Sequence, residues 1–284
     1  ELMALLEKSM DTHLEFMLPD GAWDNSWGTR SFKWTYWGGR TSDGFMGGYY
    51  TLADRHPEYA EAIHRNITLL KKATHNGLLH GGMNYHDCGV EACIHHTFGH
   101  AKALASFLNQ PVVTPAPVPL PRDKAYGAKR FEDINTWLVS EGEWRATVTG
   151  FDSEYKVKGT HPMGGVLSML WNKQIGPVFA ATMNLYTLIE APNMQAYTQP
   201  HRMSGSPRIE LIENGTMYSN LDDLDTKITY QKKGNTHQFH IVTHLVDSKQ
   251  QFSSVGKEAV EIDYIFQEKE IGIHCSIPES LRKA

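Results

Sequence analysis

Four tryptophans and two arginines lie close together near the start of the 284-residue chain. Indole rings stack on the apolar faces of sugar rings, and a guanidinium group pairs with a carboxylate or sulfate through two parallel hydrogen bonds. This combination predicts a binding site for an acidic sugar polymer. The alternative is a loop whose tryptophans only fill a core. The predicted substrate-binding residues of this stretch are Trp23, Trp27, Arg30, Trp34, Trp37 and Arg40.

A second group of residues that could act in catalysis or binding is rich in histidine. Six of the fifteen histidines lie between His75 and His100. The segment Asn84-Tyr85-His86 falls in a glycine-rich loop before an expected helix, where a titratable side chain can be aimed into a cleft. His96 and His100 are one helical turn apart and share a face, a spacing that can ligate zinc, although the glutamate of the metalloprotease pattern is missing. We expect His96 to contact substrate; simple packing of these histidines remains the alternative.

A third candidate is His161, which stands beside Pro162 and just before Gly164-Gly165. A histidine held between proline and glycines at the start of a strand is exposed and rigid, which suits a catalytic group. A histidine that only supports a turn or the core is the other interpretation.

The elements that must position these groups follow from hydrophobic spacing. In the first part of the chain apolar residues recur at helical intervals between two long loops, an arrangement typical of a functional rim. The expected order is a helix over residues 1–18, a loop over 21–48, helices over 44–55 and 57–72, a loop over 74–89 and a helix over 90–108.

The pattern changes after a proline-rich stretch over residues 111–121, which predicts a stiff linker. Apolar and polar residues then alternate, with turn signals at Asn214-Gly215 and Gly234-Asn235, as in an antiparallel β-sandwich or barrel. The expected strands cover residues 144–151, 165–171, 208–212, 227–231, 238–246 and 261–268. We therefore predict a helical domain over 1–110, a linker over 111–124 and a β-sandwich over 125–284.

The composition excludes several classes of protein. The net charge of −5, with no basic run, argues against nucleic-acid binding. No apolar run reaches the roughly 18–20 residues needed to cross a bilayer, so we expect no membrane span. Three cysteines form neither a zinc ribbon nor a disulfide framework. The chain begins inside an expected helix and shows no signal peptide, so we interpret it as a fragment. Nothing indicates an oligomeric state.

Helical hairpins, a linker and a long β-sandwich that opens with Gly159-Thr-His-Pro-Met-Gly-Gly165 resemble the heparinase II/III-like polysaccharide lyases. The resemblance implies an α+β multidomain fold: helical hairpins of an incomplete α/α toroid followed by an antiparallel β-sandwich. It implies β-elimination from a uronate-containing glycan. An acidic polysaccharide is then the expected partner, and a periplasmic or secreted location is expected.

The resemblance also assigns roles to residues. Asn25 or Asn84 would neutralise the substrate carboxylate, Tyr85 would act as proton acceptor and donor, and His161 would face the reaction from the sandwich. His86 joins them as a catalytic candidate. Several relatives hold a metal with a second His or Asp two residues after the histidine, and Met163 occupies that position here. The sequence identifies no cofactor and leaves open a divalent metal such as zinc or calcium.

Two rival functions belong to other classes. A glycoside hydrolase on an α/α toroid needs two carboxylates that flank the glycosidic bond, for which Asp24, Asp43 and Asp87 are available. A non-catalytic glycan-binding protein would use the tryptophan-rich loop alone. A lyase differs from both because its product carries a new double bond that absorbs ultraviolet light.

Overall fold

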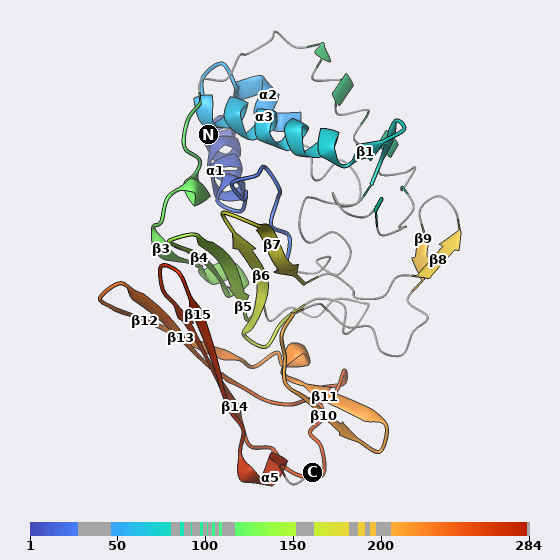
Figure 1. The fold of residues 1–284 in the computed structure, drawn as a ribbon, viewed down its shortest axis with the longest axis vertical. Coiled ribbons are helices and arrows are strands. Elements are labelled where there is room, and N and C mark those ends of the chain that lie inside the picture. Colours follow the sequence, from blue (N-terminus) through green and yellow to red (C-terminus); the bar gives the residue numbers. More distant parts are fainter. Residues whose placement is uncertain are drawn as a thin grey trace. The chain divides into compact units, whose positions relative to one another are not determined.

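The computed structural model describes residues 1–27, 47–80, 86–87, 92, 97–98, 101, 104–105, 108–109, 117–151, 162–181, 187–190, 194–196 and 206–282 (Figure 1). The chain divides into two compact units. Unit 1 comprises Glu1–Asn25, Lys33–Lys124 and Leu185–His201, and unit 2 comprises Ser26–Phe32, Ala125–Asn184 and Arg202–Ala284.

Unit 1 holds three helices, α1 (Leu2–Leu14), α2 (Gly47–Leu52) and α3 (Pro57–Lys72), in its described part. Two small hairpins accompany them: β1 (Thr74–His75) with β2 (Leu78–Leu79), and β8 (Thr187–Glu190) with β9 (Met194–Ala196). Pro57 begins α3 because its fixed φ suits the first helical turn and its missing N–H is not needed there. The shared core includes Met10, Leu14, Trp23, Tyr49, Tyr59 and Ile63.

The chain leaves α1 through a turn that only glycine can make. Asp20 Oδ1 accepts a hydrogen bond from the Ala22 N–H at 3.1 Å, and Gly21 has a φ of +91°. A Cβ on Gly21 would lie 2.5 Å from the backbone carbon of Arg65 in α3. This close approach fixes how the segment after α1 passes over α3.

Arg65 and Arg122 tie the segments of unit 1 together. Arg65 makes a two-point contact with Asp123, at 2.8 and 2.9 Å, and its Nε donates to Glu61 at 2.6 Å. The Arg122–Asp24 ion pair, at 2.8 Å, has no exposed side-chain surface on either partner. A charge buried this deeply is costly unless paired, so each arginine holds its carboxylate in place.

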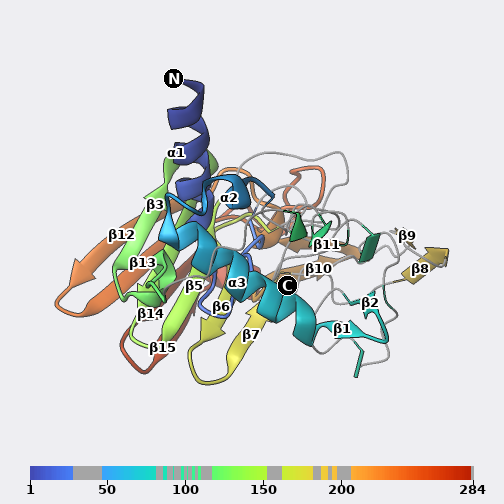
Figure 2. The same ribbon diagram turned by 90° about the horizontal axis from the view of Figure 1, so that it is seen from above.

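Unit 2 is built on two antiparallel sheets (Figures 1 and 2). The five-stranded sheet has the order β3-β4-β5-β6-β7, with bounds Gly127–Phe131, Thr136–Glu141, Trp144–Thr149, Val166–Asn172 and Gly176–Ala180. The four-stranded sheet has the order β12-β13-β14-β15, with bounds Lys227–Lys233, Thr236–Thr243, Val260–Phe266 and Ile271–Ser276. A hairpin of β10 (Glu210–Glu213) and β11 (Thr216–Ser219) and the short helix α5 (Glu279–Arg282) complete the described elements of this unit.

The two sheets share one hydrophobic core, and alternation along their strands produces it. In β13 every second residue is buried, which places Phe239 and Ile241 on the face that meets the other sheet. Strand β6 is buried at every position, so both of its faces are covered. Five of the seven residues of β6 are apolar, as burial on both faces favours.

A β-bulge interrupts the pairing of β5 with β6. The register shifts between Thr147 and Val148, opposite Leu167–Met169. The Leu167 N–H donates to the Tyr264 hydroxyl at 3.2 Å, so a side chain of β14 satisfies a buried amide of the other sheet. Ser168 Oγ reaches the Thr147 carbonyl at 3.3 Å and Ser26 Oγ at 2.9 Å. Hydrogen bonds of Leu167 and Ser168 thus connect the bulge to β14, to β5 and to Ser26.

The expected fold class was wrong. The described residues are mostly in antiparallel β-sheets, and among them no α/α toroid is formed. The amphipathic segments over 1–18 and 57–72 do fold as helices α1 and α3, but the expected long loop over 74–89 begins with the hairpin β1–β2. Much of the helix expected over 90–108 lies outside the described residues. The domain bounds 1–110, 111–124 and 125–284 stay a prediction. Over the described ranges, no helix is long and apolar enough to cross a membrane.

The buried Arg122–Asp24 pair gives a stability test. Asp24→Ala leaves the Arg122 charge buried without its carboxylate, which should lower the free energy of unfolding by about 3–5 kcal/mol. Glu132→Ala is the matched control, because the Arg130–Glu132 pair is 46% and 78% exposed. It should cost less than about 1 kcal/mol. Urea denaturation measures both; equal losses would show that burial does not set the strength of these pairs.

Candidate functional site

The predicted site residues divide between described and undescribed parts of the chain. Asn25, His86, Trp23 and Trp27 are described. The others lie outside the described residues, and their roles stay predictions: Arg30, Trp34, Trp37, Arg40, Asn84, Tyr85, His96 and His161. Two described neighbourhoods adjoin Tyr85 and His161 in sequence, the first in unit 1 and the second in unit 2, and each is described by itself.

The two described tryptophans have different surroundings. Trp23 is 1% exposed and stacks on His13 in the core of unit 1, with 4.1 Å between ring centroids. Burial lowers the pKa of His13 to about 4, so this imidazole is neutral at pH 7. Trp27 meets Phe151 edge to face at 6.4 Å and is partly exposed. Trp23 has no ring face open to a sugar in this structure, whereas Trp27 does keep exposed surface.

Three histidine rings meet beside the predicted catalytic loop. The hairpin β1–β2 turns at Asn76-Gly77, where both residues have positive φ, and pairs His75 with Leu78. The His80 N–H then donates to the Ala73 carbonyl at 2.9 Å, which places His80 next to His75. The His75 and His80 ring centroids are 5.3 Å apart.

His86 completes this cluster. Its ring stacks on His75 at 4.0 Å and meets His80 edge to face at 5.3 Å. His86 Nδ1 lies 3.3 Å from Asp87 Oδ1, and His86 is exposed while His80 is buried. His75 Nε2 is buried and has no hydrogen-bond partner among the described residues.

The histidine cluster ends at His86, the residue that follows Tyr85 in the sequence. A neutral imidazole carries one N–H donor and one acceptor nitrogen, so the cluster can both donate and accept hydrogen bonds. His86 is held by stacking on His75 and by its contact with Asp87. His75 and His80 were not predicted as site residues. The Asn-Gly turn signal at residues 76–77 could have revealed the hairpin that brings them together.

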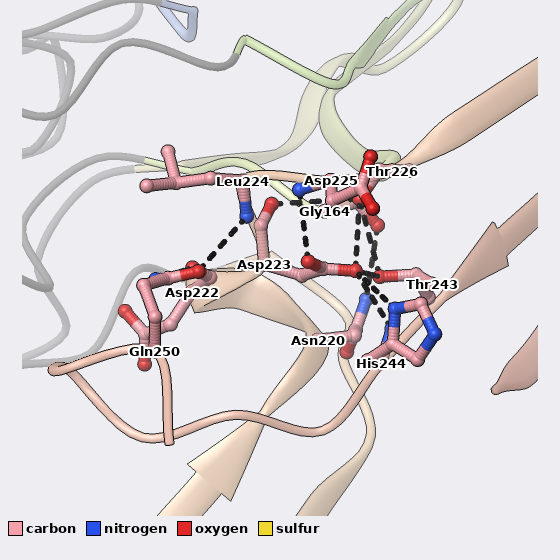
Figure 3. A network of polar contacts seen from close by, with 10 residues as sticks. All are labelled: Gly164, Asn220, Asp222, Asp223, Leu224, Asp225, Thr226, Thr243, His244 and Gln250. Carbon is pink, nitrogen blue, oxygen red and sulfur yellow. Dashed lines mark hydrogen bonds and ion pairs between the residues drawn. The ribbon is translucent and has the colours of Figure 1, made fainter. Parts of the chain in front are cut away.

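A polar network fixes the turn that follows His161 (Figure 3). The Met163 N–H donates to the Leu221 carbonyl at 3.1 Å, and Asn220 Nδ2 contacts the Gly164 carbonyl at 3.4 Å. Gly164 and Gly165 have φ values of +66° and +70°. A Cβ on Gly164 would lie 1.6 Å from the Asn220 carbonyl oxygen, so no other residue fits without rearrangement.

Asp223 is the centre of this network. Its Oδ2 accepts hydrogen bonds from Thr243 Oγ1 at 2.9 Å and from the His244 N–H at 2.7 Å, and it lies 3.3 Å from His244 Nδ1 (Figure 3). Asp223 Oδ1 accepts from the Asp225 N–H at 2.9 Å. These contacts join the segment after β11 to the end of β13 and hold the backbone against which the Gly164 turn rests.

Metal binding was left open by the sequence. Among the described residues, no group of three or more His, Cys, Asp or Glu side chains is arranged to hold a metal ion. Asp223 and His244 contact one another, but the Asp223 carboxylate already accepts several protein hydrogen bonds. These two residues could contribute ligands only if further donors joined them.

Two parts of the chain match two known protein domains. Residues 1–121 match the ulvan lyase N-terminal domain, and residues 128–284 match the ulvan lyase C-terminal domain. The chain belongs to the ulvan lyase family. It is thus a member of a family of polysaccharide lyases.

A protein named as a broad-specificity ulvan lyase, from Formosa agariphila, is 43% identical to the chain over 234 residues. The matched region is 80% of this chain and 36% of that protein, so the chain spans well under half the length of this ulvan lyase. No solved structure matches the chain. Both neighbourhoods described above fall within family-matched ranges: the histidine cluster in 1–121 and the Asp223 network in 128–284.

Asp222, beside Asp223, gives this site a measurable pH dependence. Burial and the charge of Asp247 together raise the pKa of Asp222 to about 6, against the opposing charge of Arg208. The folded chain therefore keeps a proton that the unfolded chain loses near pH 4, and stability falls as pH rises from about 4 through 6. Asp222→Asn should stabilise the protein at pH 8 relative to wild type by roughly 2 kcal/mol more than at pH 4.5.

Urea denaturation at the two pH values measures this difference. Asp225→Asn is the matched control, because Asp225 is exposed three residues away and should show almost no pH-dependent effect. A variant of Asp222 whose stability relative to wild type is the same at both pH values would mean that Asp222 is ionised throughout.

Proposed function

We propose that this chain is part of a polysaccharide lyase that cleaves an acidic, uronate-containing polysaccharide by β-elimination, and that ulvan is among its substrates. The observation that carries this proposal is the match of both parts of the chain to the two ulvan lyase domains. The 43% identity to a broad-specificity ulvan lyase supports the same reaction class.

The chemistry sets what the site must supply. The proton on C5 of a uronate is weakly acidic, because the carbanion left behind places charge beside a carboxylate. A hydrogen-bond donor that neutralises the carboxylate lowers the cost of this charge. A base then removes the proton, the electron pair forms the C4–C5 double bond, the C4–O bond breaks, and an acid protonates the departing oxygen.

The chain offers a side chain for each of these tasks. Asn25 or Asn84 would neutralise the carboxylate, Tyr85 would take the C5 proton and return a proton to the leaving oxygen, and His161 would assist. His86 is the described member of this set, and its stacking on His75 supports a fixed position for the neighbouring Tyr85. The rigid turn at Gly164-Gly165 similarly supports a fixed position for His161.

The tryptophan-rich stretch would bind the polymer. Trp27 keeps partly exposed surface, which is what stacking on a sugar requires. Arg30 and Arg40 would pair with the acidic groups, while Trp34, Trp37 and His96 would contact further sugar residues. The resemblance to the heparinase II/III-like lyases supports only this proposal of which residue plays which role. A polysaccharide does not cross a membrane unaided, so we also propose a periplasmic or secreted location.

One observation weighs against the hydrolase alternative. Asp24, a candidate for its carboxylate pair, has no exposed side-chain surface and is paired with Arg122. Asp87 is 76% exposed and contacts His86. A hydrolase needs two accessible carboxylates on either side of one bond, and neither of these residues has a described carboxylate partner for that role.

Tyr85→Phe tests the chemistry. The substitution removes one hydroxyl and should lower the elimination rate by about 10²–10⁴-fold, because a general acid–base group is lost. His161→Ala should also lose activity while it retains most substrate binding. The measurement is ultraviolet absorbance of the unsaturated product on ulvan and other uronate polymers, with the full-length protein. Tyr59→Phe is the matched control, because Tyr59 is buried in the core of unit 1. A Tyr85→Phe enzyme with more than half the wild-type rate would exclude Tyr85 from the mechanism.

Arg30→Ala and Trp27→Ala test substrate binding. Each should weaken binding to acidic polysaccharides, by loss of an ionic or a stacking contact, and should shift the melting temperature by only a few degrees. Affinity electrophoresis and thermal denaturation measure the two effects. If both variants unfold, or if a folded variant binds normally, the stretch is a packed loop with no part in binding.

A further inference from the structure

The edge of unit 2 formed by β3 and β12 has features that the proposed reaction does not use. Each is the end strand of its sheet, and both lie on the left in Figure 2. Trp137 on β4 and Tyr230 on β12 meet across this edge, with 5.0 Å between ring centroids. Both aromatic residues are partly exposed.

The edge is basic although the chain as a whole is acidic. The net charge of the chain is −5, yet β3 and β12 contain no Asp or Glu. Their charged residues, all exposed, are Lys129, Arg130, Lys227, Lys232 and Lys233. Lysines on edge strands often serve only to prevent sheets of different molecules from pairing. That role does not require aromatic rings beside the charges.

One of these cations is held in position by an aromatic ring. The Arg130 guanidinium lies over the Trp137 ring, 5.8 Å from its centroid. Its side chain is 46% exposed, and its ion pair with Glu132, at 3.2 Å, involves a carboxylate that is 78% exposed. An ion pair this exposed is weak, so an incoming anion can displace Glu132 while Trp137 keeps the guanidinium oriented.

Hydrogen bonds to a buried histidine hold the Tyr230 ring in place. The Tyr230 hydroxyl lies 2.7 Å from His237 Nδ1, and His237 Nε2 lies 3.2 Å from Glu141 Oε2. Only 3% of the His237 side chain is exposed, and a Cβ on Gly127 would lie 2.4 Å from its Cε1. Tyr230 is therefore fixed by a buried relay, as a rigid binding surface requires. Lys232 pairs with His237 in the ladder and extends the basic row beside Tyr230.

We propose that the β3–β12 edge, defined by Arg130, Trp137, Tyr230 and Lys232, is a binding surface for an anionic polysaccharide. Arg130 and Lys232 would pair with its carboxylates or sulfates, and the rims of Trp137 and Tyr230 would contact its sugar rings. The surface would hold the polymer in addition to the residues predicted to bind and cleave it. The ligand class rests on the proposed function; the location and the residues do not.

The test is the double variant Arg130→Gln/Lys232→Gln in the full-length protein. Affinity electrophoresis in gels that contain ulvan or chondroitin sulfate should show binding weakened by about tenfold, with a shallower dependence on salt because two charges are lost. The matched control is Lys173→Gln/Lys269→Gln. It removes two exposed charges from the β6–β7 and β14–β15 turns, which belong to the opposite edges of the two sheets.

A second variant separates orientation from charge. Arg130→Lys keeps the charge but loses the planar group that stacks on Trp137, so its binding should fall between that of wild type and that of the double variant. Equal losses in the test and control pairs would overturn the proposal, because overall charge would then explain binding. Unchanged binding together with aggregation of the test pair would overturn it in favour of edge protection.

Activity measurements keep this inference separate from the proposed function. The test pair should raise KM for the polymer, while turnover of a short oligosaccharide stays near the wild-type value. If the wild-type protein shows no elimination at all, the proposed function fails, and the electrophoresis result still decides whether this edge binds polysaccharide. If elimination occurs but the test pair binds normally, only the edge proposal fails.

Discussion

The burial of β6 on both faces is the constraint on which unit 2 depends. A strand with no exposed residue must satisfy every backbone donor within the protein. At the bulge opposite Thr147, the Tyr264 hydroxyl of the other sheet accepts a hydrogen bond from the Leu167 amide. One phenol thus joins the two sheets at β6.

Local patterns predicted much of the secondary structure. Helical spacing located α1 and α3, and alternation with turn signals located β5, β6 and the β12–β13 hairpin. The pattern was weaker where burial does not alternate. Edge strands β3 and β15 carry exposed residues on consecutive positions, β7 has no buried residue, and none of the three was predicted. The toroid came from a resemblance in architecture and had no support from any particular residue, and the described helices do not form one.

The candidate site was harder to predict than the elements, because its contacts join distant residues. Asp223 and His244 are separated by twenty-one positions and carry no motif, yet they meet where β11 and β13 end. Trp23 looked suitable for a sugar, but its neighbours in sequence could not show that His13 would cover its ring. Conversely, Asn76-Gly77 is a local signal strong enough to have placed His75 beside His80.

The Gly164-Gly165 turn has an evolutionary consequence. Side chains are excluded there from two directions, by the Asn220 carbonyl at Gly164 and by Ile241 at Gly165. A mutation at either position therefore disrupts folding, so selection cannot act on its effect on activity. Changes of activity that persist in related proteins must therefore come from positions other than these two glycines.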